Sequence, residues 1–210
     1  MNLCGGSPAI YLITEGRATD LNFEETKLRI LSTIRAAVEE NITLVQIREK
    51  QLAVRKLFEL TSAAAEITRG TMTRLLVNDR ADIAFGAGAD GVHLAANSLP
   101  VGVVRRNFPK EFIVGVSTHS LKETTDAADG GADFAVFAPI FKTPGKGKPQ
   151  GLDMLSEVCE STRPFPVMGL GGVDGSNCEL VLAAGASGIA AIRSLNDIES
   201  MRSIAQKLRK

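Results

Sequence analysis

The sequence predicts an α/β fold, namely a single-domain (β/α)8 (TIM) barrel spanning residues 1–210. Eight short apolar runs recur along the chain, and segments with helical spacing lie between them. A Gly-Ala-Asp/Ser turn stands before the fourth, sixth and eighth runs. The chain has 210 residues, of which 44% are hydrophobic, which is enough for one sizeable core. Barrels of this kind usually need about 200–250 residues, so this one must have short loops.

The predicted strands are nearly continuous in apolar character. This pattern is typical of parallel strands that are buried on both faces, with crossover helices between them. Eight such units without a linker favour a closed barrel over an open sheet. The strands are expected at Ala9–Thr14, Thr43–Ile47, Arg74–Asn78, Gly91–Leu94, Phe112–Ser117, Asp133–Phe137, Pro166–Leu170 and Gly188–Ile192.

Helices are predicted where apolar residues step by three and four. Asn22, with Glu25 three residues later, resembles a capping box at the first helix. Asn196 and Glu199 stand in the same relation before the last helix, and a further helix start is expected at Asp174. The apolar stripes are Leu28, Leu31, Ile34 and Val38; Ala53, Leu57, Leu60, Ala64 and Ile67; and Ile198, Met201, Ala205 and Leu208.

The three repeated turns begin at Gly88, Gly131 and Gly185, each just before a strand. Glycine suits the position after a helix where φ is positive, and the next two residues return the chain to the sheet. The repeat therefore supports the count of eight strand and helix units.

Composition excludes several classes of partner. Lys and Arg together number 24, as do Asp and Glu, so no basic excess indicates nucleic acid or an acidic membrane surface. No run approaches the roughly 18 apolar residues of a membrane span, and no signal peptide is recognised at the start. Cys4, Cys159 and Cys178 lie far apart, so we expect reduced structural thiols in a cytoplasmic protein.

In a barrel the active site lies at the C-terminal ends of the strands. The second strand runs into Gln46, Arg48 and Lys50, which strand alternation points the same way. An amide, a guanidinium and an ammonium group in one place suit a di- or polyphosphate. The alternative is a solvated charge pair between Glu49 and Lys50.

The next three strands also end in polar residues. Asn78 and Asp79 offer oxygen ligands for Mg²⁺, although Asp79 could instead cap the following helix. His93 lies within an apolar strand and is either a satisfied core residue or a ligand. The hydroxyl-rich segment from Ser117 to Ser120 could bind phosphate or cap the next helix, and neither histidine has a metal-ligand partner at a recognisable spacing.

The last three strands are followed by glycine and basic residues. The 139–149 loop contains three lysines and two glycines, which favours a flexible basic lid over an anionic substrate rather than disorder. Gly171 and Gly172 would let the backbone approach a phosphate closely. Arg193 and Ser194 follow the eighth strand beside that same site.

Taken in order, these segments resemble the thiamine-phosphate synthase family of the thiamine-phosphate synthase/TenI superfamily, over essentially the whole chain. The resemblance implies a transferase that joins hydroxymethylpyrimidine pyrophosphate to a thiazole phosphate, releases pyrophosphate and requires Mg²⁺. In the family pyrophosphate leaves first, and the thiazole nitrogen captures the resulting cation, so the leaving group's charge must be neutralised. Phosphorylated small molecules are the implied partners, and a homodimer is a family-level expectation. The matching blocks are Tyr11–Thr14, Gln46–Lys50, Asn78–Arg80, Gly91–Leu94, Gly115–His119, Pro139–Lys146 and Gly171-Gly172.

The resemblance also implies roles for individual residues. The pyrophosphate would be held by Gln46, Arg48, Lys50, Asn78, Ser117 and Lys146, of which Arg48, Lys50, Ser117 and Lys146 would be catalytic. The thiazole phosphate would be bound by Thr143 and the backbone of Gly171 and Gly172, with Ile192 and Arg193 nearby. Asp79 would bind Mg²⁺.

The chain departs from the family pattern at three places. Ser98 stands where a second Mg²⁺-binding Asp belongs, and because a hydroxyl is a weaker, neutral ligand, metal affinity should suffer. The loop has Thr143-Pro144-Gly145-Lys146 in place of Thr-x-Thr-Lys. Arg193 replaces an expected Ser and could strengthen the phosphate site or obstruct it.

Three alternatives to the synthase remain open from the sequence. TenI-like thiazole tautomerases share the barrel and use a histidine that aligns with His119. The second alternative is an enzyme with another phosphorylated substrate, and the third is a non-catalytic barrel that binds a phosphorylated ligand. The retained pyrophosphate residues favour the synthase, whereas the missing Asp at Ser98 favours the tautomerase.

Overall fold

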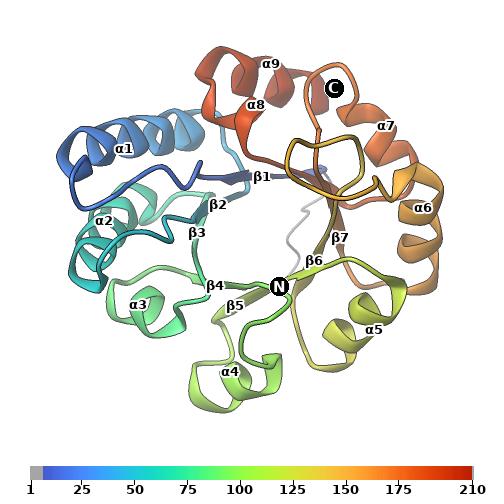
Figure 1. Cartoon of the computed structure of the whole chain (residues 1–210), viewed down its shortest axis with the longest axis horizontal. Coiled ribbons are helices and arrows are strands. Elements are labelled where there is room, and N and C mark those ends of the chain that lie inside the picture. The colour runs from blue at the N-terminus through green and yellow to red at the C-terminus, as the bar shows by residue number, and fades with distance from the viewer. Residues whose placement is uncertain (1–6, 210) are drawn as a thin grey trace.

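The computed structural model describes residues 7–209, so Cys4 and the segment considered for a signal peptide lie outside the described residues. Eight parallel strands close into a barrel in sequence order, with β1 paired to β8 as well as to β2. Figure 1 shows the helices arranged around the ring of strands. The structure therefore confirms the predicted barrel. The strands are β1 Ala9–Ile13, β2 Leu44–Ile47, β3 Arg74–Asn78, β4 Gly91–Leu94, β5 Ile113–Thr118, β6 Phe134–Phe137, β7 Val167–Leu170 and β8 Gly188–Ala191.

Each predicted strand is present, with boundaries that differ by no more than one residue. Side chains alternate between two cores, as the period of a strand requires. In β1, Ala9, Tyr11 and Ile13 face the barrel interior and pack with inward residues of the other strands. Ile10 and Leu12 face outward and pack beneath the helices. Inward-facing side chains thus fill the barrel interior beneath the C-terminal ends of the strands, and these ends are left to form a site.

The predicted stripes at 28–38, 53–67 and 198–208 lie on α1, α2 and α9, except that Ala53 is the exposed N-cap residue before α2, and most of their members are buried. Leu28 is an exception, because its side chain lies on the solvent face of α1 and is 70% exposed. In the described part of the chain, no helix is both long and apolar enough to cross a membrane. The helices are α1 Phe23–Glu39, α2 Val54–Thr68, α3 Ala81–Gly86, α4 Val101–Asn107, α5 Leu121–Asp129, α6 Gly151–Ser161, α7 Cys178–Ala183, α8 Arg193–Asn196 and α9 Ile198–Leu208.

The three repeated turns have the predicted backbone conformation. Their φ angles are 77° at Gly88, 85° at Gly131 and 93° at Gly185. The aspartate of the turn has a second role that the sequence did not predict. The Asp90 carboxylate accepts a hydrogen bond from the N–H of Leu75 at 2.8 Å, and that of Asp133 accepts one from Val114 at 2.7 Å. Each aspartate therefore ties its turn to the strand that precedes it in the barrel.

Two predicted helix starts were wrong. Asn196 is the last residue of α8, and the side chain that caps α9 belongs to Asp197, which accepts from the N–H of Ser200 at 2.8 Å. The amide of Asn196 is occupied elsewhere, because it donates to the carbonyl of Ile13 at 2.8 Å. Helix α7 begins at Cys178 rather than near Asp174, since the Asp174 carboxylate closes a turn with Ser176 first.

The start of α1 was predicted correctly, but its cap is different from the one expected. Asn22 occupies the N-cap position and makes no side-chain bond to the helix. Its carbonyl oxygen accepts instead from the N–H and hydroxyl of Thr19, at 2.7 and 3.0 Å. The asparagine therefore stabilises the loop before the helix.

Both described cysteines lie in helices and are free and buried. Burial raises the pKa of Cys159 to about 11 and also raises the pKa of Cys178. Because the thiolate is the reactive form, these thiols are inert at neutral pH. This agrees with a structural role.

Candidate active site

A cavity of about 970 Å³ opens at the C-terminal ends of the strands. Its size suits small-molecule ligands, and its position is the usual site of chemistry in this fold. Twelve of the fourteen predicted site residues line it: Gln46, Arg48, Lys50, Asn78, Ser117, His119, Thr143, Lys146, Gly171, Gly172, Ile192 and Arg193. The other two, Asp79 and Ser98, do not line it.

The end of β2 contributes three side chains to the cavity, namely Gln46, Arg48 and Lys50. Gln46 is buried, and its amide nitrogen lies 3.3 Å from the side-chain oxygen of Asn78. The backbone N–H of Arg48 donates to the hydroxyl of Thr14 at 2.8 Å, which fixes the strand end beside β1. The predicted alternation is therefore observed.

Glu49 does not form the solvated charge pair with Lys50 that was the alternative interpretation. Its side chain is 3% exposed and points toward the β1–α1 loop. There the carboxylate accepts from the N–H of Gly16 at 3.1 Å and from that of Ala18 at 2.7 Å. Lys50 is consequently left at the cavity without that partner.

Asp79 lies one hydrogen bond away from the cavity. Its two carboxylate oxygens accept from the N–H of Ala95 at 2.8 Å and from the Asn78 amide at 2.7 Å. The alternative that Asp79 caps the next helix was wrong, because Arg80 is the N-cap residue of α3 and Asp79 has a φ of 58°. A positive φ is uncommon for a residue other than glycine and is often found at functional sites.

Ser98 lies in the β4–α4 loop, where its N–H donates to the carbonyl of Ala95 at 2.9 Å. Its neighbour Asn97 lines the cavity instead. Across residues 7–209, no group of three or more His, Cys, Asp or Glu side chains could hold a metal ion.

His93 and Ser117 meet on the floor of the cavity, where the imidazole Nε2 and the hydroxyl Oγ lie 2.9 Å apart. His93 is buried and packs against the rings of Tyr11 and Phe134. Burial lowers its pKa to about 4, with Asp79 opposing this effect and Arg48 adding to it. The imidazole is therefore neutral at physiological pH. His93 is buried like a core residue but also lines the cavity, so neither interpretation from the sequence, core residue or ligand, describes it fully.

His119 lies at the rim of the cavity and is exposed. Its Nδ1 is 2.8 Å from the carbonyl of Ala138 at the end of β6, so that its other nitrogen remains available. The hydroxyl-rich segment from Ser117 to Ser120 was predicted either to bind phosphate or to cap the next helix, and its two serines differ in this respect. Ser117 faces the cavity, whereas Ser120 caps α5 by accepting from the N–H of Glu123 at 3.2 Å.

The β6–α6 loop reaches the cavity through Thr143 and Lys146. It is fixed at its base, where the N–H of Phe141 donates to the carbonyl of Gly171 at 2.9 Å. A Cβ atom on Gly171 would lie 2.8 Å from Pro139, and one on Gly172 would lie 2.8 Å from Phe141. These glycines are thus required for packing against the loop as well as for an open backbone at the cavity.

The end of β8 supplies Ile192, Arg193 and Ser194 to the cavity wall. The Ser194 hydroxyl donates to the carbonyl of Val173 at 2.8 Å, which links this segment to the glycine pair after β7. Arg193 is exposed and begins the short helix α8.

The electrostatics of the cavity favour an anionic ligand. Within residues 7–209, four lining cations form no ion pair: Arg48, Lys50, Lys146 and Arg193. The lining carboxylate of Asp174 accepts a hydrogen bond from its own loop, and that of Asp197 accepts one from the first turn of α9. Sequence reasoning missed these two residues as parts of the wall, because it placed the starts of α7 and α9 elsewhere. An accurate cap assignment would have found them.

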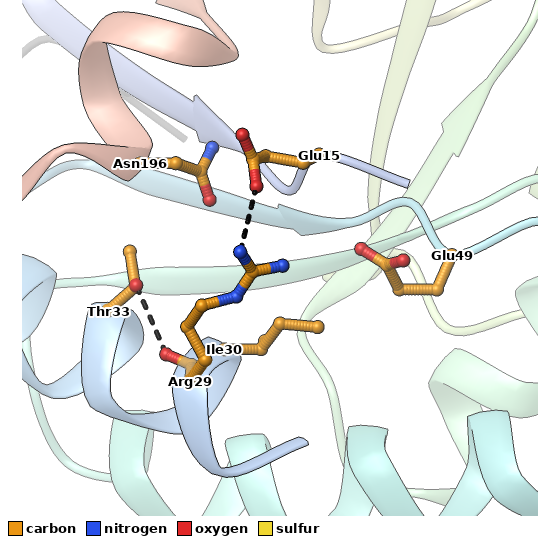
Figure 2. A pocket seen from close by; sticks show the side chains of 6 residues that line it. All are labelled: Glu15, Arg29, Ile30, Thr33, Glu49 and Asn196. Carbon is orange, nitrogen blue, oxygen red and sulfur yellow. Dashed lines mark hydrogen bonds and ion pairs between the residues drawn. The ribbon is translucent and has the colours of Figure 1, made fainter. Parts of the chain in front are cut away.

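A second, smaller cavity of about 40 Å³ lies beneath the β1–α1 loop. Figure 2 shows that Glu49 and Asn196 both reach it, together with an ion pair between Glu15 and Arg29. It is too small for a substrate and has room for a water molecule.

Comparison with known proteins gives one consistent family. The family model described as thiamine monophosphate synthase matches residues 10–195. A thiamine-phosphate synthase from Methanoculleus marisnigri is 38% identical over 178 residues, which cover 83% of this chain and 84% of that protein. One from Moorella thermoacetica is 36% identical over 182 residues, covering 85% and 86%. The structure of a thiamine phosphate pyrophosphorylase from Pyrococcus furiosus aligns with a TM-score of 0.81 at 30% identity, covering 96% of this chain and 93% of that one.

Proposed function

The chain belongs to the thiamine monophosphate synthase family, and from this premise we propose how its residues carry out the reaction. The enzyme is a thiamine-phosphate synthase, a transferase of thiamine biosynthesis, and its substrates are phosphorylated thiamine precursors. In our proposal these are hydroxymethylpyrimidine pyrophosphate and a thiazole phosphate. The observation that carries the proposal is the set of four cations around one cavity that form no ion pair with any of the described residues.

In this proposal the pyrophosphate half of the site comprises the ends of β2, β3 and β5 together with Lys146 of the β6–α6 loop. Arg48, Lys50 and Lys146 would offset the negative charge that grows on pyrophosphate as it leaves. Gln46 and Ser117 would donate hydrogen bonds to its oxygens. Because the carbon–oxygen bond breaks to give a pyrimidine-methyl cation, this half of the site needs fixed positive charge more than a proton donor or acceptor.

The thiazole phosphate would bind at the opposite wall. The open backbone of Gly171 and Gly172, the hydroxyl of Thr143 and the guanidinium of Arg193 are the groups available to it there. Thr143 currently donates to the carbonyl of Phe141 at 3.0 Å, so its hydroxyl must rotate to meet a phosphate. Ile192 supplies an apolar contact for the thiazole ring.

Magnesium fits this site as an ion that the substrate brings with it. The oxygen donors of Asp79 and Asn78 are of the type Mg²⁺ prefers, and each Asp79 oxygen keeps a lone pair beyond its one hydrogen bond. Mg²⁺ is often bound by one or two carboxylates together with substrate phosphates and water, and when bound it would neutralise part of the pyrophosphate charge. Asp79 is the proposed protein ligand.

The direct test is to incubate the protein with both substrates and Mg²⁺ and to measure thiamine phosphate and pyrophosphate by chromatography. We expect both products in equal amounts. Arg48→Ala should lower kcat/KM by about 100-fold or more, because it removes a charge-assisted contact to the leaving group. Absence of product over a wide range of Mg²⁺ concentrations would contradict the proposal.

The tautomerase alternative has one supporting observation, which is that His119 lines the cavity with one ring nitrogen available. It predicts isomerisation of a thiazole phosphate without Mg²⁺ that is lost in His119→Ala. Isomerisation that persists in that variant would exclude this role for His119. The synthase is preferred because the related proteins named above are synthases or pyrophosphorylases.

We further propose that the barrel is one domain over residues 1–210, that it acts in the cytoplasm and that it forms a homodimer. The free, buried thiols of Cys159 and Cys178 support a reducing compartment. Gel filtration with light scattering would test the homodimer.

A further inference from the structure

The buried carboxylate of Glu49 is not explained by the binding of either substrate. It lies among the residues of the smaller cavity (Figure 2) and is not part of the wall of the larger one. Burying a charge is costly unless hydrogen bonds compensate for it. Here the N–H groups of Gly16 and Ala18 provide this compensation, one to each oxygen.

The loop that Glu49 binds passes close to the Arg48 side chain, leaving no more than the room of one methyl group at Gly16. A Cβ atom built on Gly16 would lie 3.3 Å from the Arg48 guanidinium and 3.2 Å from its carbonyl oxygen. Gly16 has a φ of 75°, so the loop approaches Arg48 with bare backbone. Glu49 thus fixes the β1–α1 loop, and the Arg48 side chain lies beside this loop at Gly16.

We propose that Glu49 is a positioning residue that sets the guanidinium of Arg48 for the pyrophosphate of the substrate. The proposal rests on the function proposed above, since it assigns Arg48 to the leaving group. Glu49 itself does not line the larger cavity and acts through the β1–α1 loop. A misplacement of about 1 Å in such a contact can cost about 100-fold in rate.

The other half of the site is attached by a different hydrogen bond, which Asn196 makes beside the same small cavity and which does not involve Glu49. Asn196 donates to the carbonyl of Ile13 at 2.8 Å and so attaches α8, with Arg193 at its start, to the end of β1. Glu49 makes no hydrogen bond to α8 within residues 7–209. Loss of its carboxylate should therefore disturb binding of the pyrophosphate substrate and leave the thiazole phosphate largely unaffected.

The experiment is a double-mutant cycle with Glu49→Gln and Arg48→Ala, in which each substrate is varied while the other is saturating. Glutamine keeps the size but presents an N–H₂ group to one of the two backbone N–H donors. We expect Glu49→Gln to raise KM for the pyrimidine pyrophosphate by about 10- to 100-fold and KM for the thiazole phosphate by less than about threefold. In the Arg48→Ala background the same change should have less than about a threefold effect.

Arg29→Gln is the matched control, because Arg29 lines the same small cavity, is half exposed and reaches the β1–α1 loop only through an ion pair with the Glu15 side chain at 3.4 Å, without a bond to Glu49 or to the loop backbone. It should leave both KM values within about twofold of the wild type. Two results would overturn the proposal and show that Glu49 only stabilises the fold. One is that Glu49→Gln raises KM equally for both substrates. The other is that Glu49→Gln has the same effect on KM in the Arg48→Ala background as in the wild type.

Gly16→Ala provides a second test if Glu49→Gln does not fold by circular dichroism. The added methyl group on the β1–α1 loop should displace the Arg48 side chain and so raise KM for the pyrimidine pyrophosphate. An unchanged KM for this substrate would contradict the proposal. Calorimetry with pyrophosphate and Mg²⁺ separates this proposal from the function. If the wild type makes no thiamine phosphate but binds pyrophosphate about tenfold or more tightly than Glu49→Gln, the function fails and the positioning role stands; equal affinities would reject the positioning role.

Discussion

The Nε2 atom of His93 and the Oγ atom of Ser117 lie 2.9 Å apart on the floor of the cavity. His93 Nδ1 has no partner among residues 7–209. A buried N–H without an acceptor is rarer than a buried lone pair without a donor, so we assign the proton of the neutral ring to Nε2. His93 then donates to Ser117, whose own hydroxyl hydrogen is free to point to an anion in the cavity.

The neutrality of His93 predicts a pH-dependent stability. In the unfolded chain its pKa returns to about 6.5, whereas the folded value is about 4. As pH falls from 6.5 toward 4, the unfolded chain takes up a proton that the folded protein does not, so the free energy of unfolding decreases. The full difference between the two pKa values corresponds to a decrease of about 3 kcal/mol in the free energy of unfolding.

This prediction is checked by urea unfolding at pH 7 and pH 4.5 of the wild type, His93→Gln and the control His119→Gln. The loss of stability at low pH should be smaller in His93→Gln and retained in His119→Gln. The same pH dependence in all three proteins would show that His93 is not held neutral by the fold.

Asp79→Asn is expected to raise the Mg²⁺ concentration for half-maximal activity by about tenfold or more, because an amide oxygen is a weaker ligand than a carboxylate. The measurement is thiamine phosphate formation over a Mg²⁺ titration. Asp82→Asn is the control, since Asp82 is exposed and pairs with Arg80. If both variants have the wild-type Mg²⁺ requirement, Asp79 is not a metal ligand.

Ser98→Asp should lower the Mg²⁺ requirement only if the β4–α4 loop moves, since Ser98 lies outside the cavity in this structure. We expect Asn97→Asp, at the residue that does line the cavity, to lower it by a larger factor. Both variants are compared in the same Mg²⁺ titration. A larger effect at Ser98 would show that the loop rearranges when substrate and metal bind.

Gly172→Ala should destabilise the protein and weaken the thiazole phosphate site. The added Cβ would lie 2.8 Å from Phe141, and the backbone has a φ of 67°. We expect a loss of about 1–3 kcal/mol in the free energy of unfolding and a higher KM for the thiazole phosphate. Gly147→Ala is the control, because it meets nothing within 4 Å. Equal stability of the two variants would contradict the packing argument.

Arg193→Ser tests whether Arg193 strengthens the phosphate site or obstructs it. Because Arg193 lines the cavity and forms no ion pair among the described residues, we expect the substitution to raise KM for the thiazole phosphate by about tenfold. KM for the pyrimidine pyrophosphate should change little. A lower KM for the thiazole phosphate would show obstruction instead.

The strands and most of the cavity could be predicted because both depend on local patterns. Each strand is an apolar run, and a residue at its C-terminal end, such as Arg48 or Ser117, must reach the same face of the barrel. The sequence could not show which polar side chain forms a hydrogen bond with which distant partner. Glu49 could be read as a surface charge next to Lys50, because its partners in the β1–α1 loop are more than thirty positions away.

Helix starts were predicted less well than strands, for a related reason. Asn196 has the residue type and spacing of a cap, but its amide is used by the carbonyl of Ile13, 183 positions earlier. Asp174 and Asp197 have the same preference for caps, and only Asp197 serves as one. Local preference identified the residues suited to a turn, and tertiary contacts decided between them.

The bond from Asn196 to Ile13, together with the pairing of β1 with β8, has a consequence for protein synthesis. Until the eighth strand has left the ribosome, the nascent chain has an unpaired β1 edge and no closed cavity. Such an edge is prone to aberrant pairing, so chaperones that shield apolar strands should matter during translation. The catalytic cavity can form only after β8 has been synthesised, when that strand pairs with β1.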